Sequence, residues 1–414
     1  HLREQHELEL YEAGEHVGGH VHTHELEVEG RRLAVDSGFI VFNDWTYPGF
    51  IALLEQLGVA GQPSDMSFSV RCERTGLEDS GTSLDTLFAQ RRNLLRPSFL
   101  RMVRDILRFN REAPRALEQP DPELTLGAWL ERQRYSRGFV EHYIVPMGAA
   151  IWSAAPQRML EFPLVTFVRF FSNHGMLSVD DRPQWRVVRG GSRSYVDALV
   201  RPLQGRIHLR TPVLGLRRLP AGGVELELPE GRRARHDAVV LALHSDQALA
   251  LLRDPSSAEQ EVLGAIAYQA NDAVLHTDGS LLPRRPKARA AWNYHVLRDP
   301  AQESGHRVAV TYWMNKLQSL PVATPLCVTL NHTAAVDPAR VLRRMTYDHP
   351  VYTRETIRAQ GRRGEISGVR DTYYCGAYWR YGFHEDGLQS GLDVVRELRA
   401  RHAPVRVDAA GARP

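Results

Sequence analysis

The sequence predicts an α/β fold with a discontinuous Rossmann-like domain and a second, α+β domain. Three observations lead to this prediction. Near the start, a strand ends in a carboxylate at Glu12 and is followed by Gly18-Gly19. Helix signals dominate residues 97–171, and a continuous apolar strand, DAVVLAL, then covers 237–243. A strand followed by a helix returns near the carboxyl end, from Tyr373 onward.

Composition is that of an ordinary globular protein. Hydrophobic residues make up 43% of the 414 residues and charged residues 24%, with a net charge of +3. So small a net charge excludes a strong general attraction to nucleic acid. The three cysteines lie far apart in no metal-ligand spacing, which favours a reducing cytoplasm and no metal site. No apolar run approaches the roughly 18 residues that span a bilayer.

The first 20 residues read as the second half of a nucleotide-binding βαβ unit. Leu8-Glu9-Leu10-Tyr11 alternates apolar and polar residues like a strand, and Glu12 stands at its carboxyl end. In such units the glycine-rich GxGxxG turn and its strand come first. We therefore expect them before His1, so that the domain is N-terminally truncated in the printed sequence.

Elements of the first half follow from turn signals and periodicity. Residues 27–42 predict a hairpin with Gly30 at its turn, residues 47–57 a helix stopped by Gly58, and residues 64–70 a strand. The clearest amphipathic helix covers 97–117. One face of it carries Arg101, Arg104, Arg108, Arg111 and Arg115, and another carries Met102, Val103, Ile106, Leu107 and Ala113. Further helices are predicted over 126–131, 138–146 and 164–171.

From Trp185 the pattern changes to strands. WRVVRGGSRSYVDALVRPL predicts a strand, a Gly190-Gly191 turn and a helix. Short strands are then predicted over 206–209, 213–217, 223–228 and 237–243, and a strand-rich region over 267–329. The last strand is expected over 373–377, and it leads into the helix of GFHEDGLQSGLDVVRELR.

These elements predict a division into domains. A cofactor domain is expected from residues 1–45, 186–250 and 368–402, and a substrate domain from 46–185 and 251–367, with a disordered tail over 403–414.

Four segments fit one nucleotide cofactor. A carboxylate at Glu12 can accept both ribose hydroxyls, and Gly18-Gly19 lets the backbone approach a pyrophosphate. The Arg189-Gly190-Gly191-Ser192 turn opens a helix, and Val213 lies beside the long strand as a candidate adenine contact. In CGAYWRYGFHEDGLQSG, residues 375–391, a strand ends in glycine and leads into a helix N-terminus with small residues on its first turns.

In this order, the segments resemble the flavin-containing amine oxidase superfamily over most of the chain. LELYEAGEHVGGH is similar to its ribose and pyrophosphate stretch, and GFHEDGLQSG to its carboxyl-terminal flavin-contacting motif. More narrowly, VDSGFIVFNDWTYPGF and SDMSFSV resemble bacterial FAD-dependent proteins related to the amino-terminal region of plant cyclopropane fatty acid synthases. The resemblance implies FAD as the cofactor and a discontinuous FAD domain beside an amine-oxidase-type substrate domain.

The resemblance also implies roles for single residues. Glu12 would bind the adenosine ribose, Gly18-Gly19 the pyrophosphate, and Val213 the adenine; Gly38 would lie beside the isoalloxazine; Glu385, Asp386 and Gly387 would meet the ribityl and phosphate end. His20 stands where relatives commonly carry arginine. The cofactor-binding set predicted in full is Glu12, Gly18, Gly19, His20, Gly38, Phe39, Val213, Gly376, Glu385, Asp386 and Gly387.

A flavin performs the redox step, so few catalytic side chains are required. Tyr378 and Trp379 are candidates for lining the flavin face, with core packing as the alternative. His349 and Lys316 are candidate proton-handling residues, with structural or solvated roles as the alternative. A thiol at Cys375 could bond a flavin, but a small buried side chain is the better interpretation.

The expected activity is a flavin-dependent oxidoreductase that acts on a hydrophobic, acyl-lipid-like substrate. One alternative is an amine or amino acid oxidase that produces hydrogen peroxide. The other is a non-catalytic FAD-binding partner of a lipid methyltransferase.

The arginine-faced helix at 97–117 has two interpretations. Its apolar face packs on the substrate domain, or its basic face contacts anionic headgroups, which would make the protein membrane-peripheral.

Overall fold

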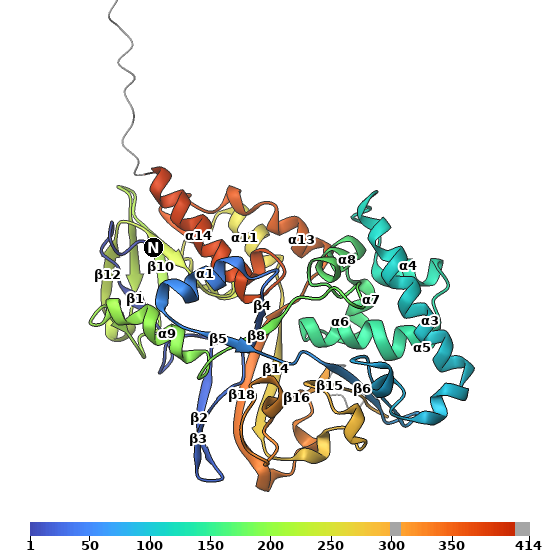
Figure 1. Ribbon diagram of the computed structural model, residues 1–414. Helices are drawn as coiled ribbons and strands as arrows, with labels where there is room; N and C mark the ends of the chain where they lie inside the picture. Colours follow the sequence, from blue (N-terminus) through green and yellow to red (C-terminus); the bar gives the residue numbers. More distant parts are fainter. Residues whose placement is uncertain (299–307, 402–414) are drawn as a thin grey trace, which may run out of the picture. The chain divides into compact units, whose positions relative to one another are not determined.

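The computed structural model describes residues 1–298 and 308–401 (Figure 1). The chain divides into two compact units. Unit 1 comprises His1–Glu15, Gly205–Gly264 and Ala359–Pro414, and unit 2 comprises His16–Gln204 and Ala265–Arg358. Compared with the predicted division, 16–45 and 186–204 fall in unit 2 and 251–264 and 359–367 fall in unit 1. The assignment of a cofactor domain and a substrate domain stays a prediction. The predicted tail at 403–414 lies outside the described residues. Within the described part of the chain, no helix is both long and apolar enough to cross a bilayer.

Unit 2 is built on a seven-stranded sheet. Its strands, in spatial order, are β18 (Val341–Pro350), β14 (Tyr268–His276), β17 (Cys327–Leu330), β16 (Ala309–Trp313), β15 (Trp292–Val296), β6 (Phe68–Cys72) and β7 (Leu77–Ser80). Neighbouring strands are antiparallel except β15 and β6, which are parallel. The predicted strand-rich region and the SDMSFSV segment therefore meet in one sheet.

A row of polar side chains crosses five of these strands. The polar row, in spatial order, consists of Thr329, Thr311, Asn293, Ser69 and Ser80, and all five are buried. Its members bond one another, since the Thr311 and Thr329 hydroxyls lie 2.8 Å apart and Ser69 donates to Asn293 Oδ1 at 2.8 Å. The hydroxyls of Ser69, Thr311 and Thr329 thus have partners inside the sheet, whereas Ser80 Oγ lies 3.0 Å from Thr82 Oγ1 in the turn after β7.

On the four strands that the two rows share, an apolar row lies one residue away from the polar row, and it extends onto β14. This aromatic row consists of Leu275, Val328, Tyr312, Trp292 and Phe68, which are also cross-strand partners. Successive side chains of a strand point to opposite faces, so the two rows lie on opposite faces of the sheet. The rings of Trp292 and Tyr312 pack edge to face with centroids 4.8 Å apart.

Smaller sheets complete the strands of unit 2. The hairpin consists of β2 (Thr23–Val28) and β3 (Arg31–Asp36), and turns at Glu29 and Gly30, both in the left-handed region. β8 (Trp185–Val188) lies between β4 (Val41–Asn43) and β5 (Gly61–Pro63). The Gly190-Gly191 turn follows β8 and leads into α9 (Arg193–Val200), as the sequence predicts.

Most helices of unit 2 form one group. They are α3 (Pro97–Glu112), α4 (Leu126–Arg132), α5 (Arg137–Phe139), α6 (Val145–Trp152), α7 (Pro156–Glu161) and α8 (Leu164–Asn173) (Figure 1). Unit 2 also contains α1 (Pro48–Leu57), α2 (Leu84–Leu87) and α12 (Met314–Leu317); α13 (Arg354–Gln360) spans the end of unit 2 and the beginning of the last segment of unit 1. Phe109, Phe139 and Phe167 are fully buried among these helices, so an aromatic core holds the group together.

The described residues of unit 1 form three small sheets and three complete α-helices. β1 (Leu10–Tyr11) pairs with β9 (Ile207–His208) and β13 (Val239–Leu241) with β19 (Thr372–Tyr374), both in parallel. β10 (Gly215–Arg218), β11 (Val224–Glu227) and β12 (Arg233–His236) form an antiparallel sheet. The helices are α10 (Ser245–Leu251), α11 (Ser257–Gly264) and α14 (His384–Arg401).

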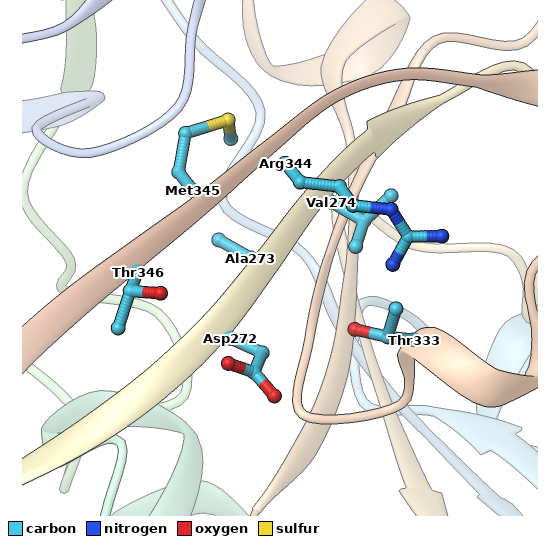
Figure 2. Close-up of a pocket in the computed structure, with 7 residues that line it drawn as sticks. All are labelled: Asp272, Ala273, Val274, Thr333, Arg344, Met345 and Thr346. Atoms are coloured by element: carbon cyan, nitrogen blue, oxygen red, sulfur yellow. The ribbon is translucent and has the colours of Figure 1, made fainter.

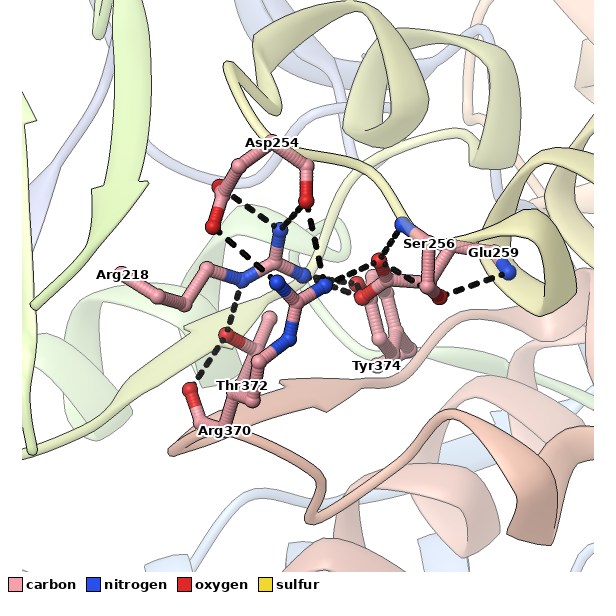
Figure 3. A network of polar contacts seen from close by, with 7 residues as sticks. All are labelled: Arg218, Asp254, Ser256, Glu259, Arg370, Thr372 and Tyr374. Carbon is pink, nitrogen blue, oxygen red and sulfur yellow. Dashed lines mark hydrogen bonds and ion pairs between the residues drawn. The ribbon is translucent and has the colours of Figure 1, made fainter. Parts of the chain in front are cut away.

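A buried ion network lies in the core of unit 1 (Figure 3). The Glu259 carboxylate pairs with Arg218 and with Arg370, and accepts a hydrogen bond from the Tyr374 hydroxyl at 2.6 Å. Ser256 adds its backbone N–H at 2.7 Å. Burial acts to raise the pKa of Glu259, but these donors outweigh it and hold that pKa below its ordinary value. The network joins β10, α11 and β19.

Several predicted boundaries are wrong by a few residues. The strand predicted over 64–70 begins only at Phe68 and runs to Cys72, because Ser64 N bonds Trp185 O and Asp65 accepts from Ser67 N in a turn. The strand predicted over 237–243 is three residues long and pairs with β19, and Val240 is 38% exposed. Leu107, predicted on the apolar face of its helix, is 55% exposed.

Candidate functional site

Unit 1 places Glu12 at the carboxyl end of β1. Its backbone N–H donates to His208 O at 2.9 Å, and its carboxylate Oε1 accepts from Gly14 N at 2.7 Å. The other oxygen, Oε2, has no hydrogen-bond partner among the described residues. It is therefore available to accept a ligand hydroxyl. Val213 follows two residues after Thr211, whose N–H donates to Glu12 O at 2.9 Å.

The start of α14 forms a second cluster in unit 1. Gly376 N donates to Ser390 Oγ at 2.8 Å, which ties the end of β19 to the second turn of α14. Asp386 Oδ2 accepts from Phe383 N at 3.0 Å, so this carboxylate caps the helix. Burial raises the pKa of Asp386 to about 6, although the N–H donors act in the opposite direction. Buried Glu385 accepts from Gln389 Nε2 at 2.7 Å, and Gly387 lies on the same turn.

The aromatic loop between β19 and α14 is buried. Tyr378 and Trp379 have exposed fractions of 3% and 6%, and their ring centroids are 4.9 Å apart. Gln360 Nε2 donates to Tyr378 O at 2.7 Å and to Arg380 O at 2.6 Å. The loop is thus held in one conformation at the base of α14.

In unit 2, the Gly18-Gly19-His20 loop lies against Gly38. Phe39 N donates to His20 O at 2.9 Å, and a Cβ built on Gly38 would lie 1.9 Å from the same oxygen. Only glycine at position 38 allows this approach of two backbones. Gly18 and Gly19 both have positive φ, and a Cβ on Gly19 would meet no atom within 4 Å.

Unit 2 also brings His20 and His349 together. Their ring centroids are 5.8 Å apart, and the His20 and Tyr347 centroids are 5.1 Å apart. The Asn271 side-chain nitrogen lies 2.9 Å from His349 Nδ1. A predicted cofactor residue and a predicted proton-handling residue therefore share one surface of unit 2.

A chain of hydrogen bonds runs beside these residues. His24 Nε2 lies 2.8 Å from Ser37 Oγ, which lies 2.7 Å from the Tyr347 hydroxyl. Burial lowers the pKa of His24 to about 4, so its imidazole is neutral at physiological pH. Sequence reasoning missed this chain, because its members come from β2, the loop after β3, and β18.

Asp36 is a second residue that sequence reasoning missed. Its buried carboxylate accepts from the Ser192 N–H at 3.0 Å, from Thr23 Oγ1 at 2.5 Å and from Gln318 Nε2 at 3.1 Å. Burial raises its pKa to about 6. Asp36 fixes the Gly190-Gly191 turn beside the hairpin and stands two residues before Gly38. The one feature of the sequence that could have indicated Asp36 is its position in VDSG, within the segment that carries the narrower family resemblance.

Lys316 lies with acidic and hydroxyl partners. Its Nζ is 3.2 Å from Asp65 Oδ2 and donates to Ser67 Oγ at 3.1 Å. The SDMSFSV segment therefore supplies both partners of the second predicted proton-handling residue.

Two pockets of unit 2 contain no predicted site residue. The first, of about 380 Å³, lies over β14 and β18 (Figure 2). It is lined by Asp272, Ala273, Val274, Thr333, Arg344, Met345 and Thr346. The second, of about 660 Å³, is lined largely by charged residues from β6, β7 and residues 284–298. In the described part of the chain, no group of three or more His, Cys, Asp or Glu side chains could hold a metal ion.

Comparison with known families decides the class of protein. A family model described as flavin-containing amine oxidoreductase matches residues 1–310. The chain belongs to this family. It is accordingly a flavin-dependent oxidoreductase and its cofactor is FAD. A search of curated proteins found no match.

Solved structures of other members share the fold of this oxidoreductase. Cyclohexylamine oxidase from Brevibacterium oxydans is 14% identical, with a TM-score of 0.64 and 94% of each chain covered. Wild-type putrescine oxidase bound to putrescine is 13% identical, with a TM-score of 0.65 and 96% and 95% covered. A fatty acid isomerase from P. acnes is 14% identical, with a TM-score of 0.65 and 95% and 92% covered. At these identities the likeness shows the fold alone.

The chemistry of the two units fits FAD. A carboxylate oxygen of Glu12 is available as an acceptor, which suits the donor hydroxyls of an adenosine ribose. Carboxylates at Glu385 and Asp386 suit ribityl hydroxyls, and first-turn N–H groups of α14 suit a phosphate. The backbone at Gly19 is open on the side where a Cβ would be. The role of each residue stays a prediction.

Proposed function

We propose that this flavin-dependent oxidoreductase removes a hydride or electrons from a hydrophobic, acyl-lipid-like substrate. The observation that carries the proposal is the aromatic row of unit 2. Its five members, Phe68, Trp292, Tyr312, Val328 and Leu275, carry no charge. A face of this kind gains free energy by covering apolar ligand surface.

The row is accessible at one end. Phe68 and Trp292 are half-buried cross-strand partners, whereas Val328 and Leu275 are fully buried. Two adjacent aromatic side chains therefore keep exposed surface, and rings of this size dominate apolar binding. This supports contact with an acyl chain at Phe68 and Trp292.

The residues of the chain bind the cofactor and the substrate, orient them and exchange protons with the substrate. FAD, when bound, accepts the hydride or electrons. In unit 1, Glu12, Val213, Gly376 and the Glu385–Gly387 turn are the proposed FAD contacts. In unit 2, the proposed FAD contacts are Gly18, Gly19, His20, Gly38 and Phe39. His349 is the proposed proton acceptor, since its imidazole is anchored by Asn271 and lies beside His20. Asp65 and Ser67 hold the Lys316 ammonium, the second proposed proton-handling group.

Anaerobic reduction of the bound flavin tests the proposal. The FAD-loaded protein is mixed with fatty acids, phospholipids, primary amines and amino acids, and loss of the visible absorbance of oxidised flavin is recorded. We expect reduction by an acyl lipid, with a KM that rises about tenfold in Trp292→Ser and stays unchanged in Trp45→Ser. Trp45 is a matched control because it is 43% exposed and lies outside the row.

Two outcomes would replace the proposal. Reduction by an amine, with hydrogen peroxide formed in air, would identify an amine or amino acid oxidase. A flavin that no compound reduces, in a protein that co-purifies with a lipid methyltransferase, would identify a non-catalytic FAD-binding partner.

A further inference from the structure

Exposed leucines gather in one stretch of unit 2. Thirteen large hydrophobic side chains are exposed among the described residues, and five of them lie between residues 84 and 107. They are Leu84 at 75%, Leu94 at 49%, Leu95 at 88%, Leu100 at 44% and Leu107 at 55%. Single exposed leucines are ordinary, but a concentration of this kind marks an interaction surface.

Helix α3 carries two of these leucines, Leu100 and Leu107, on the face opposite its core contacts. At about 100° per residue, Leu100, Arg104, Leu107 and Arg111 fall within an arc of about 60°. Phe99, Met102 and Phe109 are buried and lie on the other side of the helix. Figure 1 shows α3 on the outer side of the helical group, and η1 (Arg91–Leu95), with Leu94 and Leu95, directly precedes it. We call Leu84, Leu94, Leu95, Leu100 and Leu107, with Arg92, Arg101, Arg104 and Arg111, the Leu/Arg surface.

The charge of this stretch is strongly positive. Residues 91–115 contain eight arginines and two carboxylates, Asp105 and Glu112. Both carboxylates are engaged, since Asp105 accepts from Ser136 N and Glu112 from Arg108 and Tyr135. Arg92, Arg101 and Arg104 form no ion pair with any described carboxylate. Their charge is therefore available to an anionic partner.

A second source of positive charge adjoins η1. The pocket of about 660 Å³ is lined in part by Gln90, the residue before η1, and by four arginines, Arg71, Arg284, Arg285 and Arg298. The buried Glu78 carboxylate accepts the backbone N–H groups of Arg284 and Arg285, both at 3.0 Å. That contact fixes the backbone and leaves both guanidinium groups exposed.

The alternation of leucine and arginine favours a lipid surface over other partners. The core of a protein interface is depleted of charge, whereas here both kinds of side chain share one arc of α3. Nucleic acid would meet the arginines and leave the leucines in water. At the boundary of headgroups and acyl chains, leucines enter the apolar region while arginines extend to phosphates. We propose that the Leu/Arg surface docks the protein on a bilayer containing anionic phospholipid.

Vesicle sedimentation tests this proposal with the FAD-loaded protein. We expect binding to phosphatidylcholine vesicles that contain phosphatidylglycerol, weakening with salt, and little binding to phosphatidylcholine alone. Arg101→Gln and Arg104→Gln should each lower the partition coefficient about fivefold. Leu95→Ser with Leu107→Ser should lower it at least tenfold without changing the salt dependence. The matched control is Leu214→Ser, because Leu214 is 51% exposed and lies in unit 1.

The same variants separate the competing outcomes. Unchanged thermal unfolding in all of them excludes misfolding as the cause of lost binding. Equal binding to neutral and anionic vesicles, or no binding to either, would overturn the proposal. So would binding to duplex DNA that depends on Arg101 and Arg104 but not on the leucines, or self-association that Leu95→Ser abolishes.

Discussion

The Asp36 carboxylate accepts hydrogen bonds from both the backbone N–H and the hydroxyl of Ser192, 156 residues later in the chain. Asp36→Asn would place an amide N–H against one of these donors. A buried donor without an acceptor costs about 1–3 kcal/mol. We expect a loss of that size in the free energy of unfolding, measured with urea at neutral pH. Asp181→Asn, at an exposed aspartate, should change it by less than about 0.5 kcal/mol.

Asp79 should make stability fall as pH rises. Burial raises its pKa to about 7 from the ordinary 3.8, and its Oδ2 has no hydrogen-bond partner among the described residues. The folded state therefore favours the protonated acid, and this contribution is fully present below pH 3.8 and lost by about pH 7. The difference in pKa corresponds to about 4 kcal/mol.

Asp79→Asn isolates this contribution, because asparagine has the same shape and does not titrate. Relative to wild type, the variant should gain stability between pH 4 and pH 8 in urea unfolding. If the difference in the free energy of unfolding between wild type and Asp79→Asn did not change with pH, burial would not raise the pKa of Asp79.

Glu259 should be among the most sensitive positions of unit 1. Glu259→Gln removes the charge that Arg218 and Arg370 face, and Arg218 is itself buried (Figure 3). Breaking a buried pair on one side costs about 3–5 kcal/mol, since the other charge stays desolvated. Thermal unfolding checks this, with Glu261→Gln as control because Glu261 is 61% exposed. Equal effects of the two substitutions would contradict the importance of the network.

Gly38→Ala should separate the Gly18–His20 loop from the strand that follows Gly38. The new Cβ would lie 1.9 Å from His20 O, and a backbone oxygen cannot rotate away as a side chain can. We expect most bound FAD to be lost, measured as the flavin-to-protein ratio after gel filtration. Gly81→Ala is the matched control, because a Cβ there meets no atom within 4 Å. If Gly38→Ala kept its full FAD content, the close approach of the Gly38 backbone to His20 O would not be needed for FAD binding.

Glu12→Ala should weaken FAD binding about tenfold, since removing a charged hydrogen-bond acceptor costs about 1.5 kcal/mol. Titration of the apoprotein with FAD measures this change. Glu15→Ala should leave the Kd unchanged, because Glu15 is exposed and pairs only with Arg210 on the surface. A Kd unaffected by Glu12→Ala would place the ribose elsewhere.

Local sequence signals predicted elements whose ends are fixed locally. The helix expected over 47–57 spans Pro48–Leu57 and ends at Gly58, whose φ of 67° is the left-handed conformation that glycine favours. The hairpin turn at Gly30 follows for the same reason. Glu12 was recognisable because a carboxylate at a strand end is a local pattern. The family, the cofactor and the α/β fold class are confirmed by the comparisons, whereas the role of Glu12 stays a prediction.

Contacts between distant segments could not be read from the sequence. Nothing near Asp36 points to Ser192 or Gln318, and the His24–Ser37–Tyr347 chain joins segments more than 300 residues apart. The apolar run at 237–243 suggested a strand buried on both faces. In the structure only Val239–Leu241 forms a strand, because these are the residues that pair with β19. The polar row could not be predicted, because its members come from five strands that are far apart in the sequence.

That polar row makes the alignment of the sheet nearly an all-or-none property. If one strand slipped by a single residue, its hydroxyl would change faces and lose its partner, while an aromatic or aliphatic side chain would face the hydroxyls. The neighbouring strands would lose partners as well, because Ser69 bonds Asn293 and Thr311 bonds Thr329 across the strands. Misaligned sheets are thereby penalised at several positions at once, and the unit has a built-in check on correct assembly.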